Sequence, residues 1–164
     1  MSATGDVQFS YSRLLEDVVK FRDTLASNLG VQDLEGARVA FLAESGYNYV
    51  VTILTVWALG GFAVPLCTTH PIHEMLYTVT DSDASVILAT QHFEAKIKEL
   101  VAEVQKESSE KRSLLMIPQH QPGTSGTVPE LVDSPIADPI RHALMIYTSG
   151  TTGKPKVCRH LNAF

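Results

Sequence analysis

The strongest constraint on the fold is an alternation of short apolar runs with longer segments of helical periodicity. The apolar runs are 38–42, 62–66, 85–89 and 114–117. Between them, apolar residues recur every three or four positions in 47–59, 71–79 and 91–110. Neighbouring parallel strands need a crossover connection, so this order predicts a mostly parallel sheet with helices on both faces. The predicted fold class is α/β.

The N-terminal segment is predicted to begin with a strand and continue as a helix. Residues 7–11 alternate weakly, and Ser12 can cap a helix whose apolar positions recur as far as Leu29. Gly30 then provides the stop.

Composition limits the chain to one folded domain and to few classes of partner. Its 164 residues correspond to about one domain at roughly 150 residues each. Apolar types make up 45% and charged types 19%, which excludes global disorder. The 13 Lys and Arg against 18 Asp and Glu give a net charge of -5 without a long basic run, so a nucleic acid partner is not expected.

Neither a leader nor a membrane span is expected. The first residues lack the basic and apolar regions of a signal peptide and the Arg-rich character of a transit peptide, so we expect a cytoplasmic location. The stretch 50–66 has about the minimum length for a membrane span. It contains Gly60, Gly61 and Pro65, which favour a helix that stops before a buried strand.

Cysteines and histidines show no metal-binding or disulfide pattern. Cys67 and Cys158 lack zinc spacing, which predicts free thiols in a reducing compartment, and we expect Cys67 to be an inert core thiol. His70, His73 and His92 have no carboxylate or cysteine at ligand spacing, so no metal site is expected.

The segment 118–139 differs from the rest of the chain. It contains five prolines, two glycines and no sustained period of 2 or 3.6. We expect it to be a flexible surface loop.

The segment 148–156, TSGTTGKPK, follows the apolar run 143–147 directly and carries the clearest chemistry. Its hydroxyls and glycine backbone would lie at the carboxyl end of a parallel strand, where open α/β sheets bind ligands. Successive amides of a glycine-rich turn form an anion site, and Lys154 and Lys156 add positive charge. The ligand to expect is a phosphate group.

This loop differs from two common nucleotide-binding motifs. A Walker A loop has four residues between its glycines and a Ser or Thr after the lysine. Here two residues separate Gly150 from Gly153, and Pro155 follows Lys154, which prevents a direct continuation into a helix. No G-x-G-x-x-G dinucleotide fingerprint occurs after a predicted strand.

The run YTSGTTGKPK at 147–156 resembles the phosphate-binding signature of the adenylate-forming acyl-CoA synthetase superfamily, the AMP-binding enzymes. The stretch 36–66 resembles the first α/β repeats of that family. More narrowly, the chain resembles the malonyl-CoA synthetase branch in the segments 63–66, 70–71, Tyr77, 81–82 and 85–91.

The resemblance implies a ligase that converts a carboxylic acid, ATP and CoA into acyl-CoA, AMP and pyrophosphate, with Mg²⁺ accompanying ATP. It also implies a small carboxylic acid, malonate or a related one, as the substrate. It also implies that a full-length member of the family can be mitochondrial, although no transit peptide is seen in this sequence. The residues implied to enclose the β- and γ-phosphates are Thr148, Ser149, Gly150, Thr151, Thr152 and Gly153, and Lys154 and Lys156 are implied to supply positive charge near the departing pyrophosphate. None of these is a nucleophile or a general base, and no complete catalytic set is expected in this chain.

The chain departs from the family after Lys156. The family continues with Gly-Val and two more residues before a Thr-His-x-Asn segment, whereas here His160 and Asn162 follow two positions early. The resemblance also implies that residues 1–164 form an incomplete N-terminal AMP-binding domain without the C-terminal domain, and that they are inactive alone.

Two classes of function remain open at this point. One is a truncated acyl-activating ligase that still binds nucleotide. The other is a non-enzymatic remnant that self-associates or binds a full-length relative through exposed sheet surface.

Overall fold

A computed structural model of the chain describes residues 8–107, 112–121, 123–124, 126–127 and 142–148, together with the backbone of 156–161. The strands are β1 (Arg38–Leu42), β2 (Phe62–Pro65), β3 (Val86–Ala89), β4 (Ser113–Met116), β5 (His142–Thr148) and β6 (Lys156–Leu161). The helices are α1 (Tyr11–Leu29), α2 (Tyr47–Ala58), α3 (Ile72–Asp81) and α4 (Glu94–Glu107), and a 3-10 turn, η1 (Gln91–Phe93), precedes α4.

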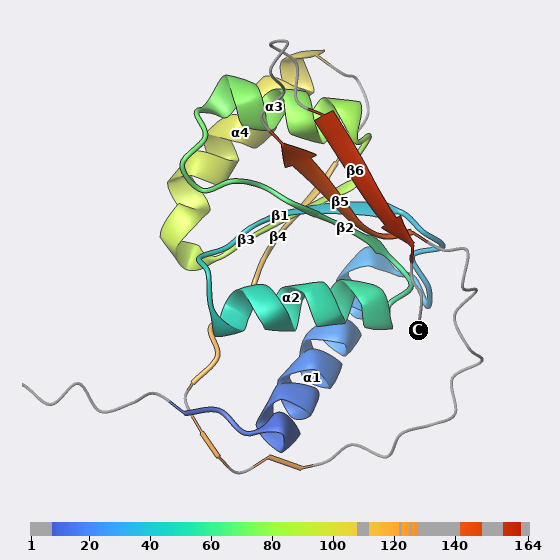
Figure 1. Cartoon of the computed structure of the whole chain (residues 1–164), viewed down its shortest axis with the longest axis vertical. Coiled ribbons are helices and arrows are strands. Elements are labelled where there is room, and N and C mark those ends of the chain that lie inside the picture. Colours follow the sequence, from blue (N-terminus) through green and yellow to red (C-terminus); the bar gives the residue numbers. More distant parts are fainter. Residues whose placement is uncertain are drawn as a thin grey trace, which may run out of the picture.

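The described strands form one mixed sheet in the order β4-β3-β1-β2-β5-β6. All neighbouring pairs are parallel except β5 and β6, which are antiparallel. Helices α1 and α2 lie on one side of the sheet, and α3 and α4 lie on the other (Figure 1). The predicted α/β fold, with a mostly parallel sheet and helices on both faces, is confirmed.

Each face of the sheet has its own hydrophobic core, because side chains alternate between faces along a strand. Ala40 and Leu42 of β1 belong to the core beneath α3 and α4. Val39 and Phe41 belong to the core shared with α1 and α2. This double burial explains why β1 and β3 read as continuous apolar runs rather than alternating ones.

The start of α1 differs from the prediction. Ser10, not Ser12, is the N-cap, and its Oγ accepts a hydrogen bond from the Arg13 amide at 3.1 Å. Tyr11 already belongs to the helix, and Phe9 makes only an isolated bridge with Gly123, so the strand predicted over 7–11 is wrong. The hydrogen bond of the Ser10 cap explains why α1 begins at Tyr11, because the first amides of a helix have no partner within the helix and the Ser10 side chain accepts from one of them.

The stretch 50–66 divides into the end of α2, a glycine turn and β2, as the sequence predicts. Gly60 has a φ of 70°, a left-handed conformation that favours glycine. In the described part of the chain, none of the helices combines the length and apolarity needed to span a bilayer. Trp57 of α2 donates a hydrogen bond from its indole N–H to the Ala143 carbonyl at 2.7 Å, which ties this helix to β5.

The segment predicted as a loop over 118–139 lies mostly outside the described residues. Its described part, which extends to residue 127, contains no helix or strand, although Gly123 pairs with Phe9. The Thr127 amide donates a hydrogen bond to a Glu16 carboxylate oxygen at 3.2 Å. This part of the segment therefore lies against the N-terminal half of α1.

A buried carboxylate, Asp17, fastens the same segment to the α1–α2 side. Asp17 is 2% exposed, and its Oδ2 lies 3.0 Å from Arg13 Nε and 3.5 Å from His120 Nδ1. The Tyr47 hydroxyl, at the start of α2, donates to the same oxygen at 2.9 Å, and the Tyr47 ring stacks on Phe9. We call Arg13, Asp17, Tyr47 and His120 the Asp17 cluster.

The Asp17 cluster predicts that stability falls in mild acid. The His120 side chain is 7% exposed, and its Nε2 is buried without a hydrogen-bond partner. Burial lowers the pKa of His120 from 6.5, and the nearby Asp17 charge opposes this shift only in part. Because the folded pKa is depressed, the contribution of His120 is complete above about pH 6.5 and is lost as the pH falls through the folded pKa.

Urea unfolding at a series of pH values between about 8 and 5 measures this slope. The variant His120→Asn should show a smaller slope, because its amide can still face Asp17 but does not titrate. An equal slope in the two proteins would contradict the assignment to His120.

Candidate functional site

The two ends of the predicted phosphate-binding segment lie opposite each other. Thr148 is the last residue of β5, Lys156 is the first of β6, and the two are paired in the antiparallel register. Thr148 is exposed. A strand rather than a helix follows the segment, which agrees with the effect expected of Pro155.

The other predicted site residues lie outside the part of the chain that the structure describes. These are Ser149, Gly150, Thr151, Thr152, Gly153 and Lys154, and the side chain of Lys156 is outside it as well. Their phosphate-binding role remains a prediction. The structure describes the two strands that these residues connect, β5 and β6, which pair as a hairpin.

The last residues of β5 are held by α3 rather than by the centre of the sheet. The Tyr147 hydroxyl donates a hydrogen bond to Asp81 Oδ2 at 2.7 Å, and the Tyr77 hydroxyl donates to Oδ1 of the same carboxylate at 3.4 Å. The Tyr77 and Tyr147 rings meet edge to face at 6.3 Å. Although the sequence analysis noted Tyr77 and Asp81, it assigned them no contact, because this pairing joins positions far apart in the chain.

Polar side chains also meet at the carboxyl ends of the parallel strands. The connections after the adjacent strands β1 and β2 lead to helices on opposite faces, and such a switch point is where open α/β sheets bind ligands. Thr90, after β3, donates a hydrogen bond to Glu44 Oε2, after β1, at 2.7 Å. Lys96 Nζ donates to the Thr68 carbonyl, after β2, at 2.9 Å. Sequence analysis missed this group, although polar residues directly after strand ends were a usable signal.

Cys67 corrects one expectation. Predicted as an inert core thiol, it is exposed and lies 3.2 Å from the Thr69 hydroxyl. Hydrogen bonding by Thr69 is the main cause that lowers the pKa of the Cys67 thiol. Leu66, which follows β2, is buried, and the chain reaches the surface at Cys67.

The three histidines weighed as metal ligands in the sequence have different surroundings in the structure. His70 Nδ1 lies 3.2 Å from Glu74 Oε2, and the His92 ring meets Phe93 edge to face. His73 is exposed on α3. Within the described ranges, no three His, Cys, Asp or Glu side chains gather as metal ligands.

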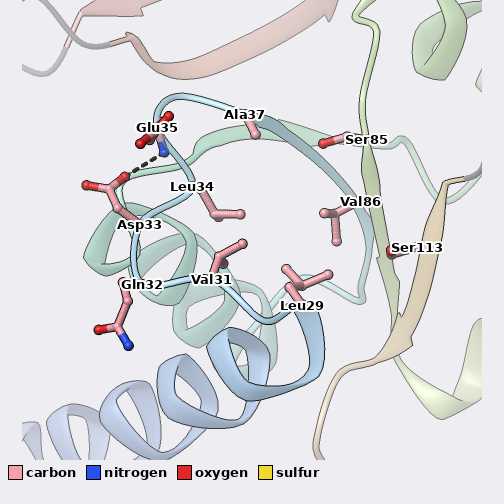
Figure 2. A pocket seen from close by; sticks show the side chains of 10 residues that line it. All are labelled: Leu29, Val31, Gln32, Asp33, Leu34, Glu35, Ala37, Ser85, Val86 and Ser113. Atoms are coloured by element: carbon pink, nitrogen blue, oxygen red, sulfur yellow. Dashed lines mark hydrogen bonds between the residues drawn. The ribbon is translucent and has the colours of Figure 1, made fainter.

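A cavity of about 640 Å³ lies away from the hairpin (Figure 2). Its lining comes from the end of α1 and its loop and from the amino ends of β3 and β4: Leu29, Val31, Gln32, Asp33, Leu34, Glu35, Ala37, Ser85, Val86 and Ser113. Asp33 accepts a hydrogen bond from the Glu35 amide there. With two carboxylates and no basic side chain in its lining, this cavity is unsuited to a phosphate group.

Comparison with known proteins decides the family. The model of the family described as AMP-binding enzyme matches residues 2–162. The chain belongs to this family. The fold agrees, since it matches the N-terminal domain of adenylate-forming enzymes.

Several members of the AMP-binding enzyme family are similar in sequence. A CoA ligase of Gibberella moniliformis is 34% identical over 150 residues, which cover 90% of this chain and 24% of the relative. The human malonate–CoA ligase ACSF3, mitochondrial, is 36% identical over 127 residues, which cover 76% of this chain and 21% of the relative. This chain therefore spans about a quarter or less of the length of these relatives.

Solved structures of family members share the fold. ATP-bound MatB from Rhodopseudomonas palustris has a TM-score of 0.71 at 24% identity, covering 98% of this chain and 31% of MatB. The o-succinylbenzoate CoA synthetase MenE of Bacillus subtilis, in complex with an acyl-adenylate, has a TM-score of 0.70 at 22% identity, covering 96% of this chain and 37% of MenE.

Proposed function

We propose that these residues form the phosphate-binding part of an ATP-dependent acyl-CoA synthetase. The observation that carries the proposal is the hairpin whose base pairs Thr148 with Lys156, in a chain whose family match spans both strands. This register brings the first hydroxyl and the last lysine of the segment TSGTTGKPK to the same end of the hairpin. A phosphate chain bound there would meet hydroxyls, glycine amides and ammonium groups together.

The proposed reaction has two steps. A substrate carboxylate attacks the α-phosphorus of ATP and releases pyrophosphate, which gives an acyl-adenylate. The CoA thiol then attacks the acyl carbon and releases AMP, which gives a thioester. Lys154 and Lys156 would stabilise the charge that develops on the departing pyrophosphate, since adenylyl transfer depends mainly on positioning and electrostatic stabilisation.

Malonate or a related small carboxylic acid is the proposed acyl substrate. Support comes from relatives named as malonate–CoA ligases in Homo sapiens and Arabidopsis thaliana. Mg²⁺ is proposed to accompany ATP as the counter-ion of its phosphates.

Equilibrium titration with Mg-ATP tests the proposal. The wild-type chain should bind Mg-ATP, and added salt should weaken the binding. Lys154→Ala/Lys156→Ala should weaken it about tenfold or more, because charge-assisted hydrogen bonds contribute about 1.5–3 kcal/mol each. Lys20→Ala/Lys98→Ala is the matched control, since both lysines lie on exposed helix faces and pair with Glu16 and Glu94.

Equal binding by the loop variant and the control would contradict the proposal. A chain that binds no Mg-ATP would instead favour a non-enzymatic role, such as association with a full-length relative. We also propose that the 164 residues make no thioester by themselves, since they hold only the pyrophosphate end of the site. Steady production of malonyl-CoA from ATP, CoA and malonate, abolished by Lys156→Ala, would overturn that part.

A further inference from the structure

Strand β5 lies beside β2, but it shares little ladder register with the parallel sheet. Its register with β2 consists of one pair, Ala63 with Leu144. From Met145 to Thr148, the ladder register in the described ranges is with β6. In Figure 1 the two strands extend away from the sheet towards α3. A two-stranded ribbon by itself is only marginally stable, so another contact must fix its direction.

Asp81 and its two phenol donors provide that contact. One oxygen accepts from Tyr147, at the penultimate position of β5, and the other accepts from Tyr77, one turn earlier in α3. Desolvation and the nearby Asp81 charge both raise the pKa of Tyr77. A phenol is protonated at neutral pH and can donate this hydrogen bond. We call Tyr77, Asp81 and Tyr147 the hairpin clamp.

The helix that carries the clamp is itself fixed. Met75 and Val79 on its inner face are 1% and 0% exposed. The Arg112 guanidinium, which is buried, donates hydrogen bonds to the carbonyls of Val79 in the last turn of α3 and of Ala84 in the turn that follows it. Asp81 is therefore attached to the core rather than to a mobile surface segment.

Hydrogen bonds, rather than close packing alone, hold the clamp together. A cavity of about 400 Å³ opens beside it, lined by His73, Leu76, Tyr77, Thr80, Asp81 and Glu107. Asp81 itself is exposed. Neighbouring side chains therefore do not enclose the carboxylate, and its two phenol partners define its position.

A carboxylate at this place is otherwise unfavourable. Asp81 is the last residue of α3, where the helix dipole disfavours negative charge. Helix stability therefore does not account for Asp81, whereas its hydrogen bond to Tyr147 does.

We propose that Asp81 is a positioning residue that acts through Tyr147 to fix the base of the β5–β6 hairpin in a nucleotide-binding direction. This inference rests on the proposed function. Tyr147 directly precedes Thr148, so a change in the clamp moves the start of the phosphate-binding segment without removing any of its donors. A displacement of about 1 Å at such a site is enough to weaken function strongly.

The test compares Asp81→Asn and Tyr147→Phe with Asp83→Asn in the full chain. Asp83 lies two residues further on, pairs with Arg38, and has a φ of 52°, which asparagine tolerates. The control therefore removes the same charge on the same side of the molecule, but from a carboxylate that pairs with Arg38 of β1. The two readouts are the Kd for Mg-ATP and amide hydrogen exchange in β5 and β6.

Both clamp variants should raise the Kd for Mg-ATP about threefold to tenfold and speed exchange in β5 and β6 by about tenfold, with β1 and β3 unchanged. The effects of the two changes should not add up in the double variant, because both act on the Tyr147–Asp81 hydrogen bond. Asp83→Asn should leave both readouts at their wild-type values.

Each remaining outcome is decisive. Unchanged exchange in β5 and β6 overturns the clamp, and so does faster exchange in every strand, which would show a general loss of stability. Faster hairpin exchange with an unchanged Kd overturns the positioning role. If the wild-type chain binds no Mg-ATP, the proposed function fails, while hydrogen exchange still decides whether the clamp holds the hairpin.

Discussion

Replacing Asp17 by alanine should lower the free energy of unfolding by about 3 kcal/mol, because it leaves the Tyr47 and His120 donors without their shared acceptor, at about 1–3 kcal/mol for each buried group. The Asp17 oxygen contacts groups from α1, from the start of α2 and from the segment that contains His120. Arg13 can turn towards solvent, since its side chain is 26% exposed, but His120 is 7% exposed. The loss therefore falls mainly on Tyr47 and His120.

Urea unfolding at neutral pH measures this effect, with Asp23→Ala as the control. Asp23 lies on the same helix and pairs with Arg22, but its side chain is 63% exposed. The control should change the free energy by less than about 1 kcal/mol, as expected for a surface pair. Similar losses in the two variants would show that the Asp17 cluster does not hold these segments together.

The helices and parallel strands were predictable because their sequence signals are local. The runs that became β1 and β3 are buried on both faces, so they contain apolar residues without interruption. Gly30 ends α1 with a φ of 68°, a conformation that few other residues tolerate. At Ser10 the local signal was ambiguous, because two serines compete for one cap and the backbone geometry selects between them.

The contacts that place the candidate site could not be read from the sequence. Tyr147 and Asp81 are 66 positions apart, and no periodicity connects them. The phosphate-binding signature was recognisable because its residue types are contiguous. The contact between the end of β5 and α3, by contrast, joins residues that are contiguous only in the fold. The motif predicts a ligand class, whereas the proposed role of α3 in orienting the hairpin could come only from the structure.

Replacing Phe41 by alanine should lower the free energy of unfolding by about 3–5 kcal/mol, the usual cost of emptying a phenylalanine site in a core. Phe41 is 0% exposed in β1, and its ring meets Tyr49 of α2 edge to face at 5.1 Å. The cavity would open between the sheet and α2. Since a domain is stabilised by only about 5–15 kcal/mol in total, this is a large fraction of its stability.

The same change should reach the candidate site through α2. This helix donates the Trp57 hydrogen bond to the Ala143 carbonyl of β5, so a looser α2 frees the strand that leads to Thr148. We expect the urea midpoint to fall strongly in Phe41→Ala. It should hardly change in the control Leu15→Ala, because Leu15 lies on α1 and is 37% exposed. A loss below about 1 kcal/mol in Phe41→Ala would mean that the core on the α1–α2 side is not closely packed.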